Sequence, residues 1–139
     1  MQWSAESNAG FTDGEPWIGV NPNHTEINVE AARGSPDSVW HYYHELIALR
    51  QDAAVLVEGE FDMLYPDHES VFAYTRTLGD DEALVVLNWS DDPTSLDVPD
   101  GVPLGDLDLA IGNYEVSTRP DAHLELQPWE ARVYLTEDR

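Results

Sequence analysis

The pattern of apolar and polar positions divides the chain into three stretches. Residues 1–34 are rich in Gly, Pro, Asn and acidic residues and show no sustained periodicity, which predicts a long loop. Residues 36–51 carry apolar side chains at the three-and-four spacing of one helix face. From Ala54 onward, short β-branched and aromatic runs alternate with turn residues, which indicates consecutive antiparallel strands.

The helix is predicted to start at Ser35-Pro36-Asp37-Ser38 and to run to about Gln51. Ser can cap a first turn, Pro fits the first helical position, and Asp favours the positive end of the helix dipole. Trp40, Tyr42 and Tyr43 could stack against sugar rings. Because aromatic residues on a helical stripe are more often core residues, we assign them to the core.

Eight runs are candidate strands, of which six to eight are expected to form. The runs are 55–57, 60–64, 71–78, 83–89, 94–98, 106–111, 123–126 and 130–135. Their regular spacing after one helix favours a mainly β fold, an antiparallel Greek-key β-sandwich preceded by a long loop and one α-helix. We therefore divide the chain into residues 1–52 and residues 53–139.

The charge balance is unusual, because 28 Asp and Glu residues face only six basic residues, all of them Arg, for a net charge of −22. This excludes binding to nucleic acid and to anionic membranes, since both need clusters of Lys or Arg. The carboxylates are scattered through turns and polar faces and do not form one run. That distribution favours adaptation to concentrated salt, in a halophile, over an acidic mimic of nucleic acid.

No metal, cofactor or membrane segment is expected from the composition. Cysteine is absent, and the histidines at positions 24, 41, 44, 68 and 123 form no ligand cluster. Asp80-Asp81 and Asp91-Asp92 fall in predicted hairpin turns, where capping of the turn backbone is favoured over a weak Ca²⁺ contact. No apolar run is long enough to span a bilayer and the N-terminus has no signal-peptide pattern, so we expect a cytoplasmic protein.

Several segments in consistent order match one family. They are 1–3, 7–12, 17–18, 20–23, 27–30, 41–43, 46–50, 71–76, 84–90 and 128–134. On these residues the chain resembles the family 13 glycoside hydrolases of the α-amylase superfamily, in their oligo-1,6-glucosidase and α-glucosidase branch. One departure is Ser4, where this branch commonly places Asp after the Gln-Trp pair.

The resemblance implies an upstream (β/α)₈ barrel that supplies an Asp nucleophile, a Glu acid/base and a second Asp. None of these three motifs occurs in the chain. Residues 1–52 then correspond to the loop after the eighth barrel strand and the last barrel helix, and residues 53–139 to the C-terminal β-sandwich. The whole enzyme would hydrolyse α-glucosidic bonds in oligosaccharides with retention, while this chain, inactive alone, stabilises the barrel.

The resemblance also places Gln2 and Trp3 in a loop beside the barrel mouth, where the enzyme forms its substrate subsites. The alternative is that Trp3 anchors the loop. No catalytic residue is assigned to this chain. The preference for α-1,4 or α-1,6 linkages is left open, because the barrel loops that select the linkage are missing.

A barrel helix without its barrel would expose an apolar face, so the isolated chain is expected to self-associate. Two alternatives from other functional classes stay open at this point. Exposure of Trp3, Trp17, Trp89 and Trp129 would favour a free-standing carbohydrate-binding module. One continuous carboxylate face would favour an acidic protein-interaction module.

Overall fold

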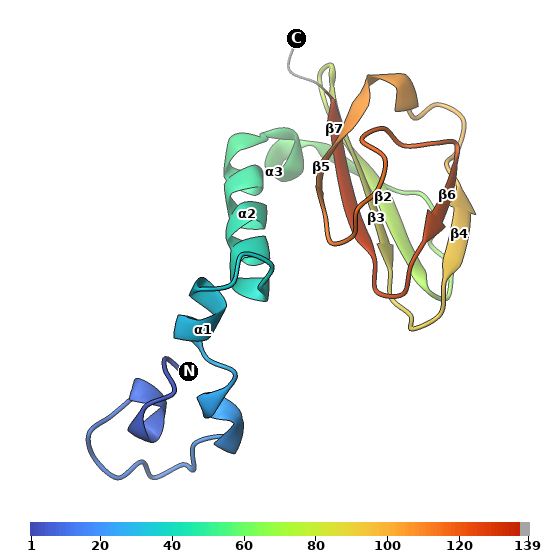
Figure 1. The fold of residues 1–139 in the computed structure, drawn as a ribbon. Helices are drawn as coiled ribbons and strands as arrows, with labels where there is room; N and C mark the ends of the chain where they lie inside the picture. Colours follow the sequence, from blue (N-terminus) through green and yellow to red (C-terminus); the bar gives the residue numbers. More distant parts are fainter. Residues whose placement is uncertain (137–139) are drawn as a thin grey trace. The chain divides into compact units, whose positions relative to one another are not determined.

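The computed structural model describes residues 1–136, and the chain falls into two compact units, Met1–Ala48 and Leu49–Arg139 (Figure 1). The helical elements are η1 (Ser7–Gly10), η2 (Pro22–Thr25), α1 (Val29–Arg33), α2 (Val39–Asp52), α3 (Val55–Glu58) and η3 (Leu104–Asp106). The division proposed from the sequence, between residues 52 and 53, stays a prediction. Its second part extends to residues 137–139, which lie outside the described residues.

The expected loop 1–34 contains a helix, α1, which its sequence pattern did not reveal. Asn28 caps this helix: its side-chain carbonyl accepts from the Ala31 N–H at 2.8 Å, and its amide donates to the His24 carbonyl at 2.8 Å. A helix of five residues is too short to show a periodic apolar face. The available signal was an Asn cap followed by Glu30 in the first turn.

The main helix, α2, begins at Val39, later than predicted. The backbone N–H of Ser38 bonds the Ser35 carbonyl at 3.1 Å, so the Ser-Pro-Asp-Ser segment forms a turn before the helix. The Ser38 hydroxyl donates to the Ala32 carbonyl at 2.6 Å, and the Ser38 carbonyl accepts the helical bond from Tyr42. Pro36 therefore lies in the turn and not at the first helical position.

No side chain of α2 is buried in this chain. Trp40 and Tyr43 are 37% and 64% exposed, and Tyr42 is half-buried. The assignment of these three aromatic residues to the core is therefore wrong here, because helical periodicity identifies an apolar face but not whether the chain itself supplies a partner for it. Partial burial, with a contribution from the nearby Glu45, raises the pKa of Tyr42.

The second unit is an antiparallel β-domain, as predicted. Its described strands are β1 (Glu60–Met63), β2 (Val71–Leu78), β3 (Asp81–Asn88), β4 (Thr94–Asp97), β5 (Leu107–Gly112), β6 (His123–Leu126) and β7 (Ala131–Thr136). One sheet has the order β1-β2-β3-β7-β5, and β4 and β6 form a two-stranded sheet (Figure 1). From β3 to β7 every connection passes from one sheet to the other, which is the non-sequential connectivity of a Greek-key sandwich.

The hydrophobic core lies between the two sheets. Strand alternation places every second side chain of β2 on this inner side, where Val71, Ala73 and Thr75 are buried. In β3 the four successive residues 83–86 are all buried, so both of its faces are covered. The buried core residues are Val71, Ala73, Leu84, Val86, Leu96, Val98, Leu107, Leu124, Leu126 and Tyr134. The apolar runs in the sequence thus predicted the positions of the central strands.

The predicted strand at 55–57 is wrong, because these residues form the short helix α3. The guanidinium of Arg76 donates to the carbonyls of Val55 at 3.2 Å, Val57 at 3.1 Å and Gly59 at 2.8 Å. A side chain 17 to 21 residues away in sequence therefore satisfies the C-terminal carbonyls of the helix. This tertiary contact overrides the β-propensity of two valines.

Replacing Gly59 by Ala is expected to lower the free energy of unfolding by about 1–3 kcal/mol, as overpacking does elsewhere. A Cβ atom at Gly59 would lie 2.5 Å from the Val55 carbonyl oxygen and 3.2 Å from Cβ of Arg76. The backbone at the end of α3 would have to move. Urea unfolding in concentrated KCl measures the effect, and Gly105→Ala is the control, since nothing lies within 4 Å of a Cβ there. Equal stability of the two variants would contradict this account.

Candidate functional site

Gln2 holds the N-terminal segment to the region around residues 21–30. Its side-chain amide donates to Oδ1 of Asn23 at 3.0 Å and to the Ile27 carbonyl. The backbone carbonyl of Gln2 accepts from the Val29 N–H at 2.9 Å. Gln2 is half-buried, whereas Trp3 is 50% exposed. The amide of Gln2 is thus committed to contacts within the loop, and the Trp3 ring remains accessible.

The same loop contains three successive residues with left-handed backbone, Asn8, Ala9 and Gly10, at φ values of 55°, 54° and 64°. Ala9 is only 1% exposed, and its carbonyl accepts from the N–H groups of Trp3 at 2.9 Å and Ser4 at 3.1 Å. An alanine in this conformation stores strain, and such residues concentrate at functional sites. Strain at Ala9 was not predictable from the residue type, since Gly and Asn, and not Ala, are the residues that commonly adopt this conformation.

A hollow of about 450 Å³ lies in this loop and is lined by residues between positions 1 and 21, Gln2 among them. Its large apolar lining side chains are exposed: Trp17 at 94%, Met1 at 79%, and Phe11 and Ile18 at 63% each. Among its lining residues, Glu15 is the single acid. Such a surface can hold the apolar face of a ligand, but retaining hydrolysis needs two carboxylates across one sugar.

The most buried polar side chains belong to the β-domain and not to the loop. Asn88, 3% exposed, donates through its amide to the carbonyls of Asp92 and Gln127, both at 2.9 Å. Its carbonyl accepts from the N–H of Ser90 at 3.1 Å and from the Ser90 hydroxyl at 2.9 Å. Asn88 therefore ties the loop after β3 to the segment before β7, and its role is structural.

Glu130 and Arg132 form an ion pair inside the β-domain. Oε1 of Glu130 lies 2.6 Å from Nε of Arg132, and the two side chains are 0% and 10% exposed. Oε2 of Glu130 accepts from the Gln127 N–H at 2.6 Å, and Arg132 also donates to the Glu125 carbonyl. Burial lowers the pKa of Arg132, but hydrogen bonds to Glu130 and Tyr134 outweigh it and raise the pKa overall.

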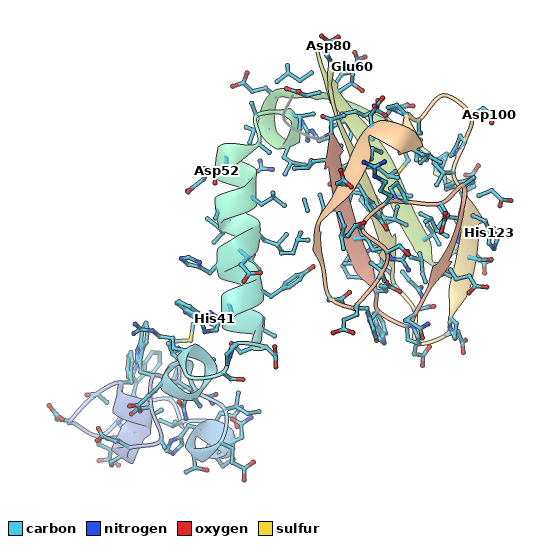
Figure 2. All side chains as sticks on the ribbon, turned by 45° about the horizontal axis from the view of Figure 1, so that its top comes forward. His41, Asp52, Glu60, Asp80, Asp100 and His123 are labelled. Atoms are coloured by element: carbon cyan, nitrogen blue, oxygen red, sulfur yellow. The ribbon has the colours of Figure 1, made fainter. Side chains whose placement is uncertain are left out.

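The remaining acidic residues are spread over both units of the chain. Figure 2 shows Glu60 and Asp80 at the same end of the β1-β2-β3 strands, Asp100 in a separate turn and Asp52 at the end of α2. Asp80 lies with Gly79 in the two-residue turn between β2 and β3, where Gly79 has a φ of 64°. Within residues 1–136 there is no group of three or more His, Asp or Glu side chains that could hold a metal ion.

Two further properties follow from the described part of the chain. None of its helices is both long and apolar enough to cross a membrane. The four tryptophans singled out from the sequence are exposed: Trp3 at 50%, Trp17 at 94%, Trp89 at 64% and Trp129 at 56%. This is the exposure expected of a free-standing carbohydrate-binding module, and equally that of surfaces that a further domain would cover.

Two family models match consecutive parts of the chain. The model of the α-amylase catalytic domain matches residues 1–59, and the model of the maltogenic amylase C-terminal domain matches residues 61–133. The second match covers the β-domain and more than half of the chain. The two matches leave one residue between them, so the end of a catalytic domain leads directly into the β-domain.

Individual relatives agree with these matches. The oligo-1,6-glucosidases of Parageobacillus thermoglucosidasius and Halalkalibacterium halodurans are 44% and 41% identical to the chain over 96% and 97% of its length. The crystal structure of the trehalulose synthase from Pseudomonas mesoacidophila superposes with a TM-score of 0.88, at 37% identity over 98% of the chain. In each case the chain spans 24% of the relative's length.

The fold, the order of the two family matches and the identity to relatives lead to one conclusion. The site residues of the loop belong to the matched end of a catalytic domain, and the buried polar pairs belong to the matched C-terminal domain. The chain therefore belongs to family 13 of the glycoside hydrolases, the α-amylase family, and corresponds to the end of the catalytic domain followed by the C-terminal β-domain of oligo-1,6-glucosidase-like members.

Proposed function

We propose that this chain is the non-catalytic C-terminal part of an enzyme that hydrolyses α-glucosidic bonds in oligosaccharides with retention. The continuous match to a catalytic-domain end and a C-terminal domain carries this proposal. The partner of the chain is the catalytic (β/α)₈ barrel of the same enzyme, which supplies the catalytic carboxylates and binds the oligosaccharide. The chain alone has no hydrolytic activity.

Within the loop, Gln2 is a positioning residue and Trp3 lies beside the substrate. The hydrogen bonds from the Gln2 amide to Asn23 and Ile27 support the first role, and the exposure of the Trp3 ring supports the second. The backbone carbonyl of Ala9, a residue with strained left-handed backbone, accepts a hydrogen bond from the Trp3 N–H and so fixes the position of the Trp3 backbone. Neither residue performs proton transfer or nucleophilic attack, because neither side chain carries a titratable group suited to it.

The two other functional classes are not favoured. The exposed tryptophans fit a free-standing carbohydrate-binding module. However, residues 1–59 match a catalytic domain, so the rest of that domain can cover exposed tryptophans in the same enzyme. The acidic residues lie on several separate elements, so a single carboxylate face for a protein partner is not favoured either (Figure 2). The chain is a component of a hydrolase, in the cytoplasm of a halophile.

A chimeric enzyme tests this proposal. In it, the chain replaces the corresponding 24% of the oligo-1,6-glucosidase of Halalkalibacterium halodurans. We expect the chimera to hydrolyse p-nitrophenyl α-glucoside, and to keep this activity on heating longer than a version that ends at residue 59. A folded chimera without hydrolysis, or one no more heat-stable than the shortened version, would refute the proposed function.

Salt is expected to stabilise the chain strongly. With a net charge of −22, repulsion between carboxylates opposes folding. KCl screens this repulsion, because the Debye length falls from about 10 Å at 0.1 M to about 3 Å at 1 M. The unfolding temperature should rise continuously with KCl concentration. Asp80→Asn combined with Asp100→Asn removes two exposed charges and should weaken the dependence. An unfolding temperature that is flat or falls with added KCl argues against adaptation to salt.

A further inference from the structure

The sequence contains two Asp-Gly pairs, Asp13-Gly14 and Asp100-Gly101, and both lie in exposed loops. In such a pair the backbone nitrogen of the glycine can approach the carboxyl group of the preceding aspartate, because glycine has no Cβ atom to hinder the approach. The two pairs share this chemistry, so a difference in their reactivity must come from the structure around them. They differ in what holds the backbone N–H of the glycine.

Asp100 and Gly101 are the central residues of a turn between β4 and η3 (Figure 2). The Val102 N–H bonds the Pro99 carbonyl at a long 3.4 Å, and Gly101 has a φ of 108°, which only glycine adopts easily. Within residues 1–136, no group accepts a hydrogen bond from the Gly101 N–H. Beyond its chain neighbours, nothing lies within 4 Å of a Cβ there. The Gly101 nitrogen is therefore open to the Asp100 carboxyl group.

The Asp13-Gly14 pair is held by hydrogen bonds on both sides of the glycine. The Gly14 N–H donates to Oγ1 of Thr12 at 3.1 Å, and the Gly14 carbonyl accepts from the side-chain amide of Asn8 at 3.0 Å. The same amide donates to the Thr12 carbonyl at 3.0 Å. Attack by the Gly14 nitrogen requires that its bond to Thr12 break first. One hydrogen bond of ordinary strength corresponds to a factor of about five in a rate.

We propose that Asp100-Gly101 is a site of spontaneous isoaspartate formation, a covalent modification that the bonds around Gly14 slow at Asp13. In the first step the Gly101 nitrogen forms a bond to the side-chain carboxyl carbon of protonated Asp100. The carboxyl hydroxyl leaves with the proton of that nitrogen as water, and a succinimide ring results. Water then opens the ring: opening at the side-chain carbonyl restores aspartate, and opening at the main-chain carbonyl gives isoaspartate. The reaction needs no reagent besides water, and the charge of the residue is unchanged.

Isoaspartate at this position disturbs the core of the β-domain, because both ends of the turn are anchored in it. Val98 is 8% exposed and belongs to the buried core cluster, and Val102 packs against that cluster. The Val98 N–H also bonds the Ala122 carbonyl at 2.7 Å. Isoaspartate lengthens the main chain by one carbon atom between the two valines, so at least one of them must move. The modified β-domain should unfold at a temperature about 4–8 °C lower.

The test is incubation of the chain in concentrated KCl at neutral pH, followed by peptide mapping with electron-transfer fragmentation, which distinguishes isoaspartate from aspartate. We expect isoaspartate to accumulate about fivefold faster at Asp100 than at Asp13. Asp100→Glu is the matched control: it keeps the charge, but its longer side chain closes a ring much more slowly. This variant should stay unmodified in the turn and keep its unfolding temperature. Thr12→Val removes the acceptor of the Gly14 N–H and should raise the rate at Asp13 toward that at Asp100.

Three results would overturn the inference. The first is equal accumulation of isoaspartate at the two pairs, or none at Asp100. The second is an unchanged rate at Asp13 in Thr12→Val, because the hydrogen bond of Gly14 is then not what slows the reaction. The third is a fall in unfolding temperature of equal size in the unsubstituted chain and in Asp100→Glu, which would place the damage elsewhere. The test needs no hydrolytic activity, so its outcome is independent of the proposed function.

Discussion

Replacing Asn88 by Ala is expected to lower the free energy of unfolding of the β-domain by about 3 kcal/mol, because the substitution leaves several buried backbone groups without partners. The Gln127 carbonyl and the Ser90 N–H both lose the hydrogen bond that Asn88 supplies. At 3% exposure of Asn88, water cannot easily replace these bonds. The measurement is urea unfolding of the isolated chain in concentrated KCl, followed by tryptophan fluorescence.

Asn113 offers a matched control for this prediction. Its amide also bridges two backbone groups, accepting from the Ala131 N–H at 2.8 Å and donating to the Trp129 carbonyl at 2.8 Å, but its side chain is exposed. Water can replace these bonds, so Asn113→Ala should cost only about 1 kcal/mol. If the two variants are equally stable, burial does not determine how much the hydrogen bonds of Asn88 contribute to the free energy of unfolding, and the account of these bonds is wrong.

Replacing Arg132 by Leu is expected to destabilise the chain by about 3–5 kcal/mol, because it leaves the Glu130 carboxylate buried without its counter-charge. The Glu130 side chain is 0% exposed and would keep only the hydrogen bond from the Gln127 N–H. Arg119 pairs with Asp108 at 3.3 Å but is 59% exposed, so Arg119→Leu should cost no more than about 1 kcal/mol. The same urea unfolding experiment compares the two variants.

A double-mutant cycle makes the claim about the ion pair specific. Glu130→Leu alone also leaves a buried charge, now on Arg132, whereas the double Leu variant leaves none. The loss in the double variant should therefore be smaller than the sum of the single losses by about 2 kcal/mol. Additive losses would show that the two residues act through packing alone.

The strands were predictable from the sequence because their signals are local. Runs of β-branched, aromatic and other apolar residues, with Gly79-Asp80 as a turn between them, are enough to define β2 and β3. The helix α3 was not predictable, since the contacts that favour it come from Arg76 in a distant strand. The exposure of the apolar side chains of α2 was not predictable either, because periodicity describes one face of a helix and says nothing about the partner of that face.

The candidate site was predictable only as a position in the chain. The resemblance directed attention to Gln2 and Trp3, but it did not reveal that the Gln2 amide is taken up by Asn23 and Ile27. The left-handed backbone of Ala9 was not predictable, because alanine rarely adopts a positive φ and nothing in its residue type indicates one. Asn88 was visible in a family-like segment, but its hydrogen bond to the Gln127 carbonyl, 39 residues away, is fixed only by the fold. The partners of Glu130, Gln127 and Arg132, are near in sequence, but only the fold buries them.

The measurement that tests the central claim most directly is hydrolysis of p-nitrophenyl α-glucoside in concentrated KCl. The chain is assayed alone and then mixed with the part of the Halalkalibacterium halodurans oligo-1,6-glucosidase that precedes the aligned region. We expect no hydrolysis from the chain alone and hydrolysis after mixing, because the catalytic carboxylates lie in the barrel. Hydrolysis by the chain alone would contradict the account and place a catalytic carboxylate pair within these 139 residues.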